Sequence, residues 1–188
     1  NELPTIYSKK ELVKIIEEHE DANMSDVDED EERIIKGALT FSDKKVEAVM
    51  TPRNVVVSFA GTQTINSDFI TRVMQEGHSR YPVYNADKDN VVGILYSKHL
   101  LGDTMLGKQV RDVMLQDVQE VSEEESLDDV LDTFLHTHKH IAIVKDEFGG
   151  VSGVITLEDV IEEILKKEII DESDIHDDMR IYAKESAK

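Results

Sequence analysis

Residues 78–101, HSRYPVYNADKDNVVGILYSKHLL, align without a gap with residues 138–161, HKHIAIVKDEFGGVSGVITLEDVI. In this alignment Gly93 matches Gly153. A unit of roughly 60 residues that occurs twice predicts two copies of one small supersecondary block that share a core. Each copy is also a control for the other, because residues found in only one copy are not needed to build the unit.

The composition narrows the classes of protein to which the chain can belong. It has 188 residues, no cysteine and a formal net charge of −20, from 41 acidic and 21 basic residues. Such a charge argues against a nucleic-acid partner and against docking on anionic lipid. Without cysteine there is no disulfide framework and no thiolate metal site. Apolar runs are far shorter than the ~18 residues that span a bilayer, and no signal-peptide pattern opens the chain, so we expect a soluble protein.

The first 45 residues predict a helical lead-in. Residues 9–20, KKELVKIIEEHE, place apolar residues at helical spacing opposite an acidic face. We expect Ser25 to cap a second helix, because the acidic residues that follow suit the positive end of a helix dipole. The spacing of Asp26, Asp28 and Asp30 could suit calcium, but the glycine and distal glutamate of an EF-hand are missing, which favours a solvated helix start.

Both copies predict the element order β-α-β-β-α. In the first we expect a strand at 46–49, a turn at 51–52, an extended segment at 55–60, a helix at 66–78, strands at 80–84 and 91–96 around a polar turn at 85–90, and a short helix from Ser97. In the second we expect an extended segment at 118–121, a helix capped by Ser126, strands at 140–144 and 152–156 around a glycine-containing turn, and a helix at 157–168. One unit cannot cover its own sheet, so the two should pack face to face.

A strand runs directly into a helix at Gly153-Val-Ile-Thr156-Leu-Glu-Asp159. Its first interpretation is a capping box, in which the threonine caps the helix and the aspartate reaches back to the cap amide. The same helix start offers free amides to a phosphate, and an acid one turn later can bind a ribose diol. The first copy has Tyr96 and His99 at the aligned positions, so the threonine and aspartate are not required by the fold.

The first copy has unmatched residues of its own. It reads MTPR at 50–53, where the second copy reads MLQD at 114–117. Pro82 lies in mid-strand, against Ala142 in the second copy. A proline removes a donor from the strand ladder, so this segment should lie at a sheet edge or face a cleft. We therefore expect each copy to supply half of one site.

Four motifs carry a resemblance to a known family: VMTPR at 49–53, HSRYPVY at 78–84, DEFGG at 146–150 and GVITLEDVIEEI at 153–164. In this order they resemble the CBS-domain pair, or Bateman module, of the cyclin M/CorC (hemolysin-like) family of magnesium and cobalt transport proteins. The resemblance implies an α+β fold with two CBS domains in pseudo-twofold contact. The implied boundaries are 1–45 for the lead-in, 46–105 and 106–170 for the two CBS domains, and 171–188 for an acidic tail or linker.

In that family the pair is a cytosolic regulatory module that binds an adenine nucleotide, ATP or AMP, with or without magnesium, and controls an attached divalent-cation transport domain. The resemblance implies no enzyme activity. Because Tyr96 and His99 replace the threonine and aspartate in the first repeat, we expect one nucleotide for each chain. The binding residues carried over are Thr51 and Pro52 beside the base or ribose, Tyr81, Pro82 and Val83 as a wall against the adenine, Thr156 and Asp159 at the ribose and phosphate, and Arg80 as a positive charge for phosphate.

The resemblance also implies a disk-like homodimer and a transmembrane domain outside this chain, which would place the module on the cytoplasmic side of a membrane. Two alternatives remain open: a ligand-free dimerisation module, and a direct sensor of divalent metal. For the histidines at 136, 138 and 140 we favour a helix end over a metal site. Glu158, Glu162 and Glu163 predict a solvated helix face. No Ser/His/Asp arrangement or Walker loop supports an enzyme.

Overall fold

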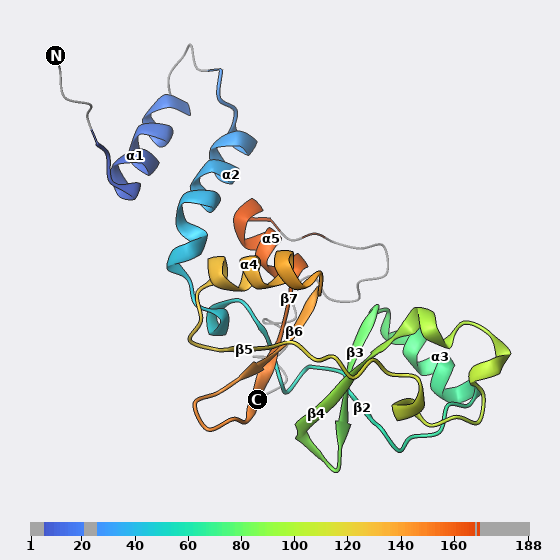
Figure 1. The fold of residues 1–188 in the computed structure, drawn as a ribbon. Coiled ribbons are helices and arrows are strands. Elements are labelled where there is room, and N and C mark those ends of the chain that lie inside the picture. The colour runs from blue at the N-terminus through green and yellow to red at the C-terminus, as the bar shows by residue number, and fades with distance from the viewer. Residues whose placement is uncertain (1–5, 21–25, 168, 170–188) are drawn as a thin grey trace.

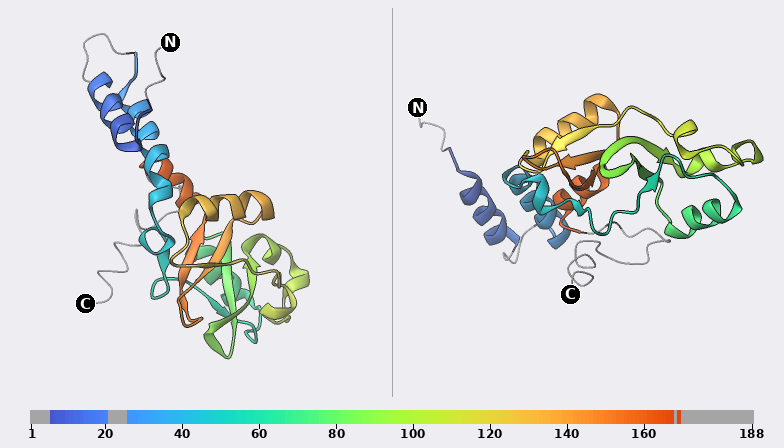
Figure 2. Two further views of the ribbon diagram at one scale, coloured as in Figure 1. Left: turned by 60° about the vertical axis from the view of Figure 1, so that its left-hand side comes forward. Right: turned by 90° about the horizontal axis from the view of Figure 1, so that it is seen from below.

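The computed structural model describes residues 6–20, 26–167 and 169. It shows a helical lead-in followed by two α+β units that lie side by side (Figure 1). Both views in Figure 2 show the lead-in projecting from the second unit, on the side away from the first. Ser25 and the tail predicted from residue 171 lie outside the described residues. No helix in the described ranges combines the length and the apolar character that a membrane crossing needs.

The lead-in consists of α1 (Lys9–Glu20) and α2 (Glu29–Thr40), so the helix predicted at 9–20 is confirmed. The prediction that Ser25 caps the second helix is wrong. Asp28 is the N-cap, because its carboxylate accepts from the Glu31 amide at 2.9 Å while the Glu31 carboxylate accepts from the Asp28 amide at 3.1 Å. This reciprocal capping box satisfies two backbone donors and fixes the start at Glu29. Short 3₁₀ turns follow at Phe41–Asp43 and Val46–Ala48.

The two units have the predicted α+β order. The first unit contains β2 (Phe59–Ala60), α3 (Ser67–Glu76), β3 (Arg80–Asn85), β4 (Asp87–Tyr96) and a 3₁₀ helix at Ser97–Leu100. The second contains β5 (Glu120–Ser122), α4 (Leu127–Thr137), β6 (Ile141–Lys145), β7 (Val151–Thr156) and α5 (Leu157–Leu165). In each unit the first strand is parallel to the second, and the last two strands form an antiparallel hairpin. Further 3₁₀ turns at Asp103–Met105 and Val110–Asp112 lie between the units along the chain.

Three local predictions are corrected. Residues 46–49, expected as a strand, contain the 3₁₀ turn, and the expected turn at 51–52 is strand β1 (Thr51–Pro52). The hairpin turn expected at 85–90 is tighter, because β4 begins at Asp87 and Ala86 takes up a positive φ of 63°.

The leading segment of each repeat packs on the other unit. β1 pairs antiparallel with β7, which puts Thr51 opposite Val154, and the four-stranded sheet has the order β1-β7-β6-β5. In the pseudo-symmetric place, Ile94 of β4 exchanges two backbone hydrogen bonds with Leu115, at 2.8 and 2.9 Å. Each leading segment also contributes an apolar residue to the core of the other unit: Val46 is buried in the core of the second unit and Val110 in that of the first.

This exchange explains the paired glycines. A Cβ on Gly153 would lie well under 3.0 Å from the carbonyl oxygen of Thr51. A Cβ on Gly93 would lie 2.8 Å from the carbonyl oxygen of Leu115. Each glycine therefore leaves room for the crossing segment of the other repeat.

A third core joins the units. Its buried members come from both sheets and are all aliphatic: Ile94 from β4, Ile141 and Ile143 from β6, and Val154 from β7. The two sheets therefore pack face to face, and each covers apolar side chains that one unit alone would leave exposed.

The lead-in is anchored to the second unit through α5. A Cβ on Gly37 of α2 would overlap the carbonyl oxygen of Ile164, so the two helix backbones approach closely. The Arg33 side chain donates to the Leu165 carbonyl at 3.0 Å. Glu163 is buried and receives hydrogen bonds from Lys44 and Lys166. The prediction of a solvated face is thus wrong at Glu163, which is 8% exposed because α2 and its following turn cover it.

Candidate functional site

A cleft of about 550 Å³ lies between the two units, where β3 begins and β7 runs into α5. This volume is in the range that holds small organic ligands. Five of the eight residues predicted for nucleotide binding line it: Thr51, Arg80, Pro82, Thr156 and Asp159. The cleft thus combines residues that are unique to the first repeat with residues unique to the second, as the comparison of the copies predicts.

Thr156 and Asp159 form the capping box of α5. The Thr156 amide donates to the Asp159 carboxylate at 2.6 Å, and the Asp159 amide donates to the Thr156 hydroxyl oxygen at 3.2 Å. The Thr156 hydroxyl also donates to the Asp159 carboxylate, at 2.7 Å. The capping interpretation is therefore confirmed, and both residues still line the cleft. The cap holds their side chains in one arrangement at the positive end of the α5 dipole.

Arg80 brings a positive charge to the cleft from the start of β3. Its side chain is 25% exposed, and Nη1 lies 3.8 Å from Oε1 of Glu158. Its Nε is buried and has no hydrogen-bond partner among the described residues. A buried donor that lacks a partner is costly to the folded state, and a ligand oxygen would satisfy it.

Pro82 faces the cleft without weakening its sheet. Its pair on β4 is Ile94, whose backbone amide and carbonyl both bond to Leu115 on the other side. Pro82 therefore stands at a non-hydrogen-bonded position of the β3–β4 ladder, where a missing donor costs nothing. On the other side of β3, Pro82 lies beyond the end of β2, because β2 pairs with β3 only at Val83 and Tyr84. Of the two places predicted for this segment, a sheet edge or a cleft, the structure shows the cleft.

The other three predicted residues lie elsewhere. Tyr81 and Val83 are fully buried in the core of the first unit, because successive side chains of a strand point to opposite faces. The Tyr81 hydroxyl donates to the Val73 carbonyl at 2.8 Å and accepts from the His78 amide at 3.0 Å. Burial raises the pKa of Tyr81 to about 12. Pro52, in β1, pairs with Gly153 of β7 and does not line the cleft.

Much of the cleft lining lies outside the predicted residues. The apolar run at 55–57 forms part of the wall, and its three successive valines next to the MTPR motif are a signal that could have been used. The other lining residues outside the prediction come from the α3–β3 turn, the sheet face of the second unit, α5 and the chain just after α5: Gly77, His78, Ser79, Ile141, Val154, Glu158, Glu162 and Ile169.

The charges around the cleft are mixed but mainly acidic. Glu158, Asp159 and Glu162 line it from α5, while Arg80 provides the guanidinium. Within the described residues, no three His, Asp or Glu side chains are placed to hold a metal ion. His136 contacts its own helix, with Nδ1 2.7 Å from the Asp132 carbonyl oxygen.

Comparison with known proteins identifies the fold and its class. The family model described as "CBS domain" matches residues 46–103 and again residues 110–166. The chain therefore belongs to the CBS-domain family and carries two CBS domains in tandem.

Individual relatives define the class more narrowly. The chain is 35% identical over 175 residues to the magnesium and cobalt efflux protein CorC of Escherichia coli K12, a match that covers 92% of this chain and 58% of CorC. CorC of Vibrio cholerae is 37% identical over 162 residues, covering 84% of this chain and 54% of that protein. The chain thus spans little more than half the length of these relatives.

Solved structures agree with this assignment. The CBS domain of a bacterial CNNM/CorC family Mg²⁺ transporter is 34% identical, with a TM-score of 0.77, and the match covers 88% of this chain and 100% of that one. A structure of such a domain in complex with ATP is 33% identical, with a TM-score of 0.67 over 73% of this chain and 98% of that one. The chain is homologous to the CBS module of this transporter family, which is not a family of enzymes.

Proposed function

We propose that this chain is a regulatory module that binds an adenine nucleotide in the cleft between its CBS domains and thereby controls an attached divalent-cation transport domain. The observation that carries the proposal is that Thr156 and Asp159 of one repeat meet Arg80 and Pro82 of the other around a single cleft. A related module has been solved with ATP, and the transport domain would lie in the part of the relatives that this chain does not cover.

The two sides of the cleft suit the two ends of a nucleotide. The valines at 55–57 and Pro82 provide an apolar wall for a base. At the other side, the positive end of the α5 dipole suits a phosphate, and the Asp159 carboxylate provides acceptors for a ribose. Arg80 supplies an unsatisfied buried donor for a phosphate oxygen.

The acidic residues of α5 favour a nucleotide whose charge is partly neutralised. Glu158, Asp159 and Glu162 would repel a bare triphosphate, and Arg80 alone does not offset them. A magnesium ion bound to the phosphates would reduce this repulsion. ATP with magnesium is therefore the ligand we favour, with AMP as the smaller alternative.

Helix α5 provides a route from the cleft to the lead-in. Its first residues line the cleft, and its last turn packs on α2 through the Gly37 contact and the Arg33 hydrogen bond. A nucleotide that prefers one position of α5 would bias α2 by at most its difference in binding free energy between the two positions, because a ligand shifts a conformational equilibrium only by its differential affinity. We propose that the attached membrane domain receives this bias, that the module works on the cytoplasmic side, and that it forms a homodimer.

The test is a calorimetric titration of the protein with ATP, ADP and AMP, each with and without magnesium. Thr156→Ala and Asp159→Ala should each weaken ATP binding by at least tenfold, which is about 1.4 kcal/mol. Because both changes also remove a helix cap, the matched control is Asp28→Ala. That variant removes the same kind of capping box from α2, away from the cleft, and should bind ATP as the unmodified chain does.

Three other results would count against the proposal. Absence of binding at millimolar nucleotide would favour the dimerisation module, and a light-scattering mass would then show whether the chain is dimeric. Stabilisation by magnesium alone, with no effect of nucleotide, would favour the metal sensor. Equal loss of ATP affinity in Asp28→Ala would mean that the cleft variants act through stability and not through contact.

A further inference from the structure

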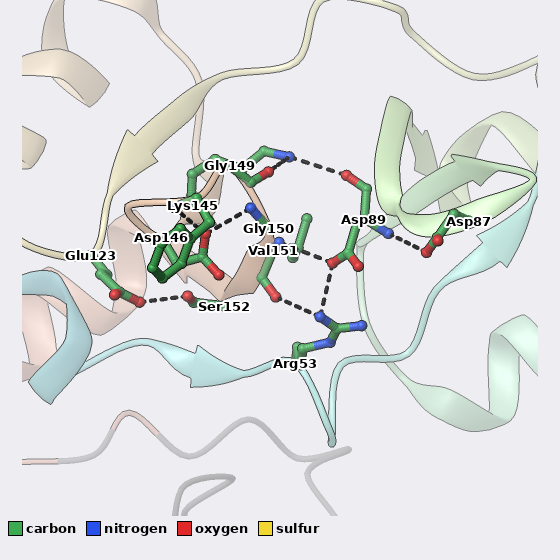
Figure 3. Close-up of polar contacts among 11 residues, drawn as sticks. Arg53, Asp87, Asp89, Glu123, Lys145, Asp146, Gly149, Gly150, Val151 and Ser152 are labelled. Carbon is green, nitrogen blue, oxygen red and sulfur yellow. Dashed lines mark hydrogen bonds and ion pairs between the residues drawn. The ribbon is translucent and has the colours of Figure 1, made fainter.

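At the end of the inter-unit crevice away from Thr156 and Asp159, the two units are joined by polar contacts centred on Asp89 (Figure 3). The Asp89 carboxylate accepts from Nη1 of Arg53 at 2.8 Å and from the backbone amide of Val151 at 3.0 Å. Lys145 donates to the Asp89 carbonyl at 3.1 Å. Asp89 is on the β3–β4 hairpin of the first unit, whereas Val151 and Lys145 belong to the hairpin of the second.

The same contacts hold the crossing segment. The Arg53 amide donates to the Ser152 carbonyl at 2.8 Å, which extends the β1–β7 pairing by one residue. Its guanidinium then reaches across to Asp89 (Figure 3). Arg53 is thus fixed to the second unit by its backbone and by a bond of 3.4 Å from Nη1 to the Val151 carbonyl, and to the first unit by its bond to Asp89.

We call the contacts of Asp89 with Arg53, Val151 and Lys145 the clamp. It lies along the same crevice between the units as the candidate nucleotide cleft. A small cavity of about 30 Å³ beside the clamp is lined by Arg53 and Val151, and shares Val56, Pro82 and Val154 with the cleft. The clamp therefore closes the narrow end of the crevice, and the cleft is its wide end. At the wide end the ionic contact between units, from Arg80 to Glu158, is 3.8 Å long.

The repeat supplies an internal control for this clamp. In the alignment of the copies, Arg53 matches Asp117 and Asp89 matches Gly149. The pseudo-symmetric place therefore cannot form the contact, and Asp117 pairs with Lys139 at 2.5 Å. The second copy builds the same unit without the clamp, so the fold of a single unit does not require it.

We propose that Asp89 is a positioning residue for the nucleotide cleft. By holding Arg53 and the Val151 amide, it fixes the angle between the units and the course of the chain from Thr51 to Val57, which forms one wall of the cleft. The inference rests on the proposed nucleotide site and assigns a residue outside the cleft that sets its affinity. Asp89 itself does not line the cleft.

The first measurement is the distance between the units. Because the chain has no cysteine, spin labels can be placed at Gln75→Cys in α3 and Asp132→Cys in α4, two exposed positions on opposite units. Double electron–electron resonance on labelled protein diluted into unlabelled protein should give a broader distribution of the distance between the two labels in Asp89→Ala than in the parent chain. Asp117→Ala removes an exposed carboxylate and its ion pair and should leave the distribution unchanged.

The second measurement is the affinity for ATP with magnesium. The carboxylate is 40% exposed, so its contact with Arg53 is screened by water, and we expect affinity to fall roughly three- to tenfold in Asp89→Ala. Asp89→Asn keeps an acceptor for the Val151 amide and should recover part of the loss. Asp117→Ala should bind ATP normally. Circular dichroism and thermal unfolding establish that each variant is folded.

The outcomes separate the clamp from the proposed function. A distribution in Asp89→Ala as narrow as in the parent overturns the inference, as does a broadened distribution with unchanged ATP affinity. If the parent chain binds no ATP, the proposed function fails, and positioning of a nucleotide cleft fails with it. The distance measurement, which needs no nucleotide, then still shows whether Asp89 clamps the units.

Discussion

Replacing Gly153 by alanine should damage both the fold and the cleft. Gly153 does not have a positive φ, so alanine suits its backbone, and the effect comes from the added methyl group alone. That methyl would lie well under 3.0 Å from the Thr51 carbonyl oxygen, which is backbone and can move only if β1 shifts away from β7. Overpacking of this kind costs about 1–3 kcal/mol of unfolding free energy.

The pseudo-symmetric change, Gly93→Ala, is the matched control. Its methyl would meet the flexible thioether of Met114 and would lie 2.8 Å from the Leu115 carbonyl oxygen. Met114 can rotate away, so we expect a cost of about 1 kcal/mol, at the lower end of the overpacking range. Neither Met114 nor Leu115 lines the cleft, whereas Thr51 does. Urea unfolding should therefore rank Gly153→Ala below Gly93→Ala, and only Gly153→Ala should lose ATP affinity. Equal stability of Gly153→Ala and the parent chain would refute the close crossing of β1 over β7.

The remaining predictions concern single side chains. Tyr81→Phe should lose about 1 kcal/mol of stability in urea unfolding, through its hydrogen bond to Val73, yet bind ATP normally; a weakened affinity would return Tyr81 to the site. Arg80→Ala should weaken the binding of ATP by roughly tenfold, and an unchanged affinity in titration would contradict a contact between Arg80 and a phosphate. Burial alone would raise the pKa of Glu163, but hydrogen bonds from Lys166 and Lys44 outweigh it and hold the pKa below its usual value. The folded-state pKa of Glu163 is thus lower than its unfolded one, so its contribution to the unfolding free energy is present above about pH 4.3 and is lost as the pH falls further. Glu163→Gln should therefore be less stable than the parent chain at neutral pH. Its unfolding free energy should fall less than that of the parent chain between pH 7 and pH 3.

The sequence was most informative where a pattern repeats or where one copy departs from it. Strand and helix order followed from periodicity, and the division of the cleft between Thr156 and Pro82 followed from comparing the copies. The capping box at Asp159 was also predictable, since its spacing alone specifies it.

What the sequence did not reveal depends on contacts between distant segments. Thr51–Pro52 has the composition of a turn and becomes a strand only because β7 offers it an edge beside Gly153. Glu163 has the spacing of an exposed helix face and is buried only because α2 docks there. The resemblance predicts Tyr81 at the cleft together with its neighbour Pro82, although the alternation of a strand puts the two side chains on opposite faces.

The most direct test of the account is the number of nucleotides bound by each chain. The asymmetry between the copies places Thr156 and Asp159 at one cleft, while Tyr96 and His99 occupy the aligned positions of the first repeat. Calorimetric titration of the intact chain with ATP and magnesium should therefore saturate at one ATP per chain. Saturation at two per chain, or no saturation at millimolar ATP, would contradict the claim that the two repeats build a single composite site.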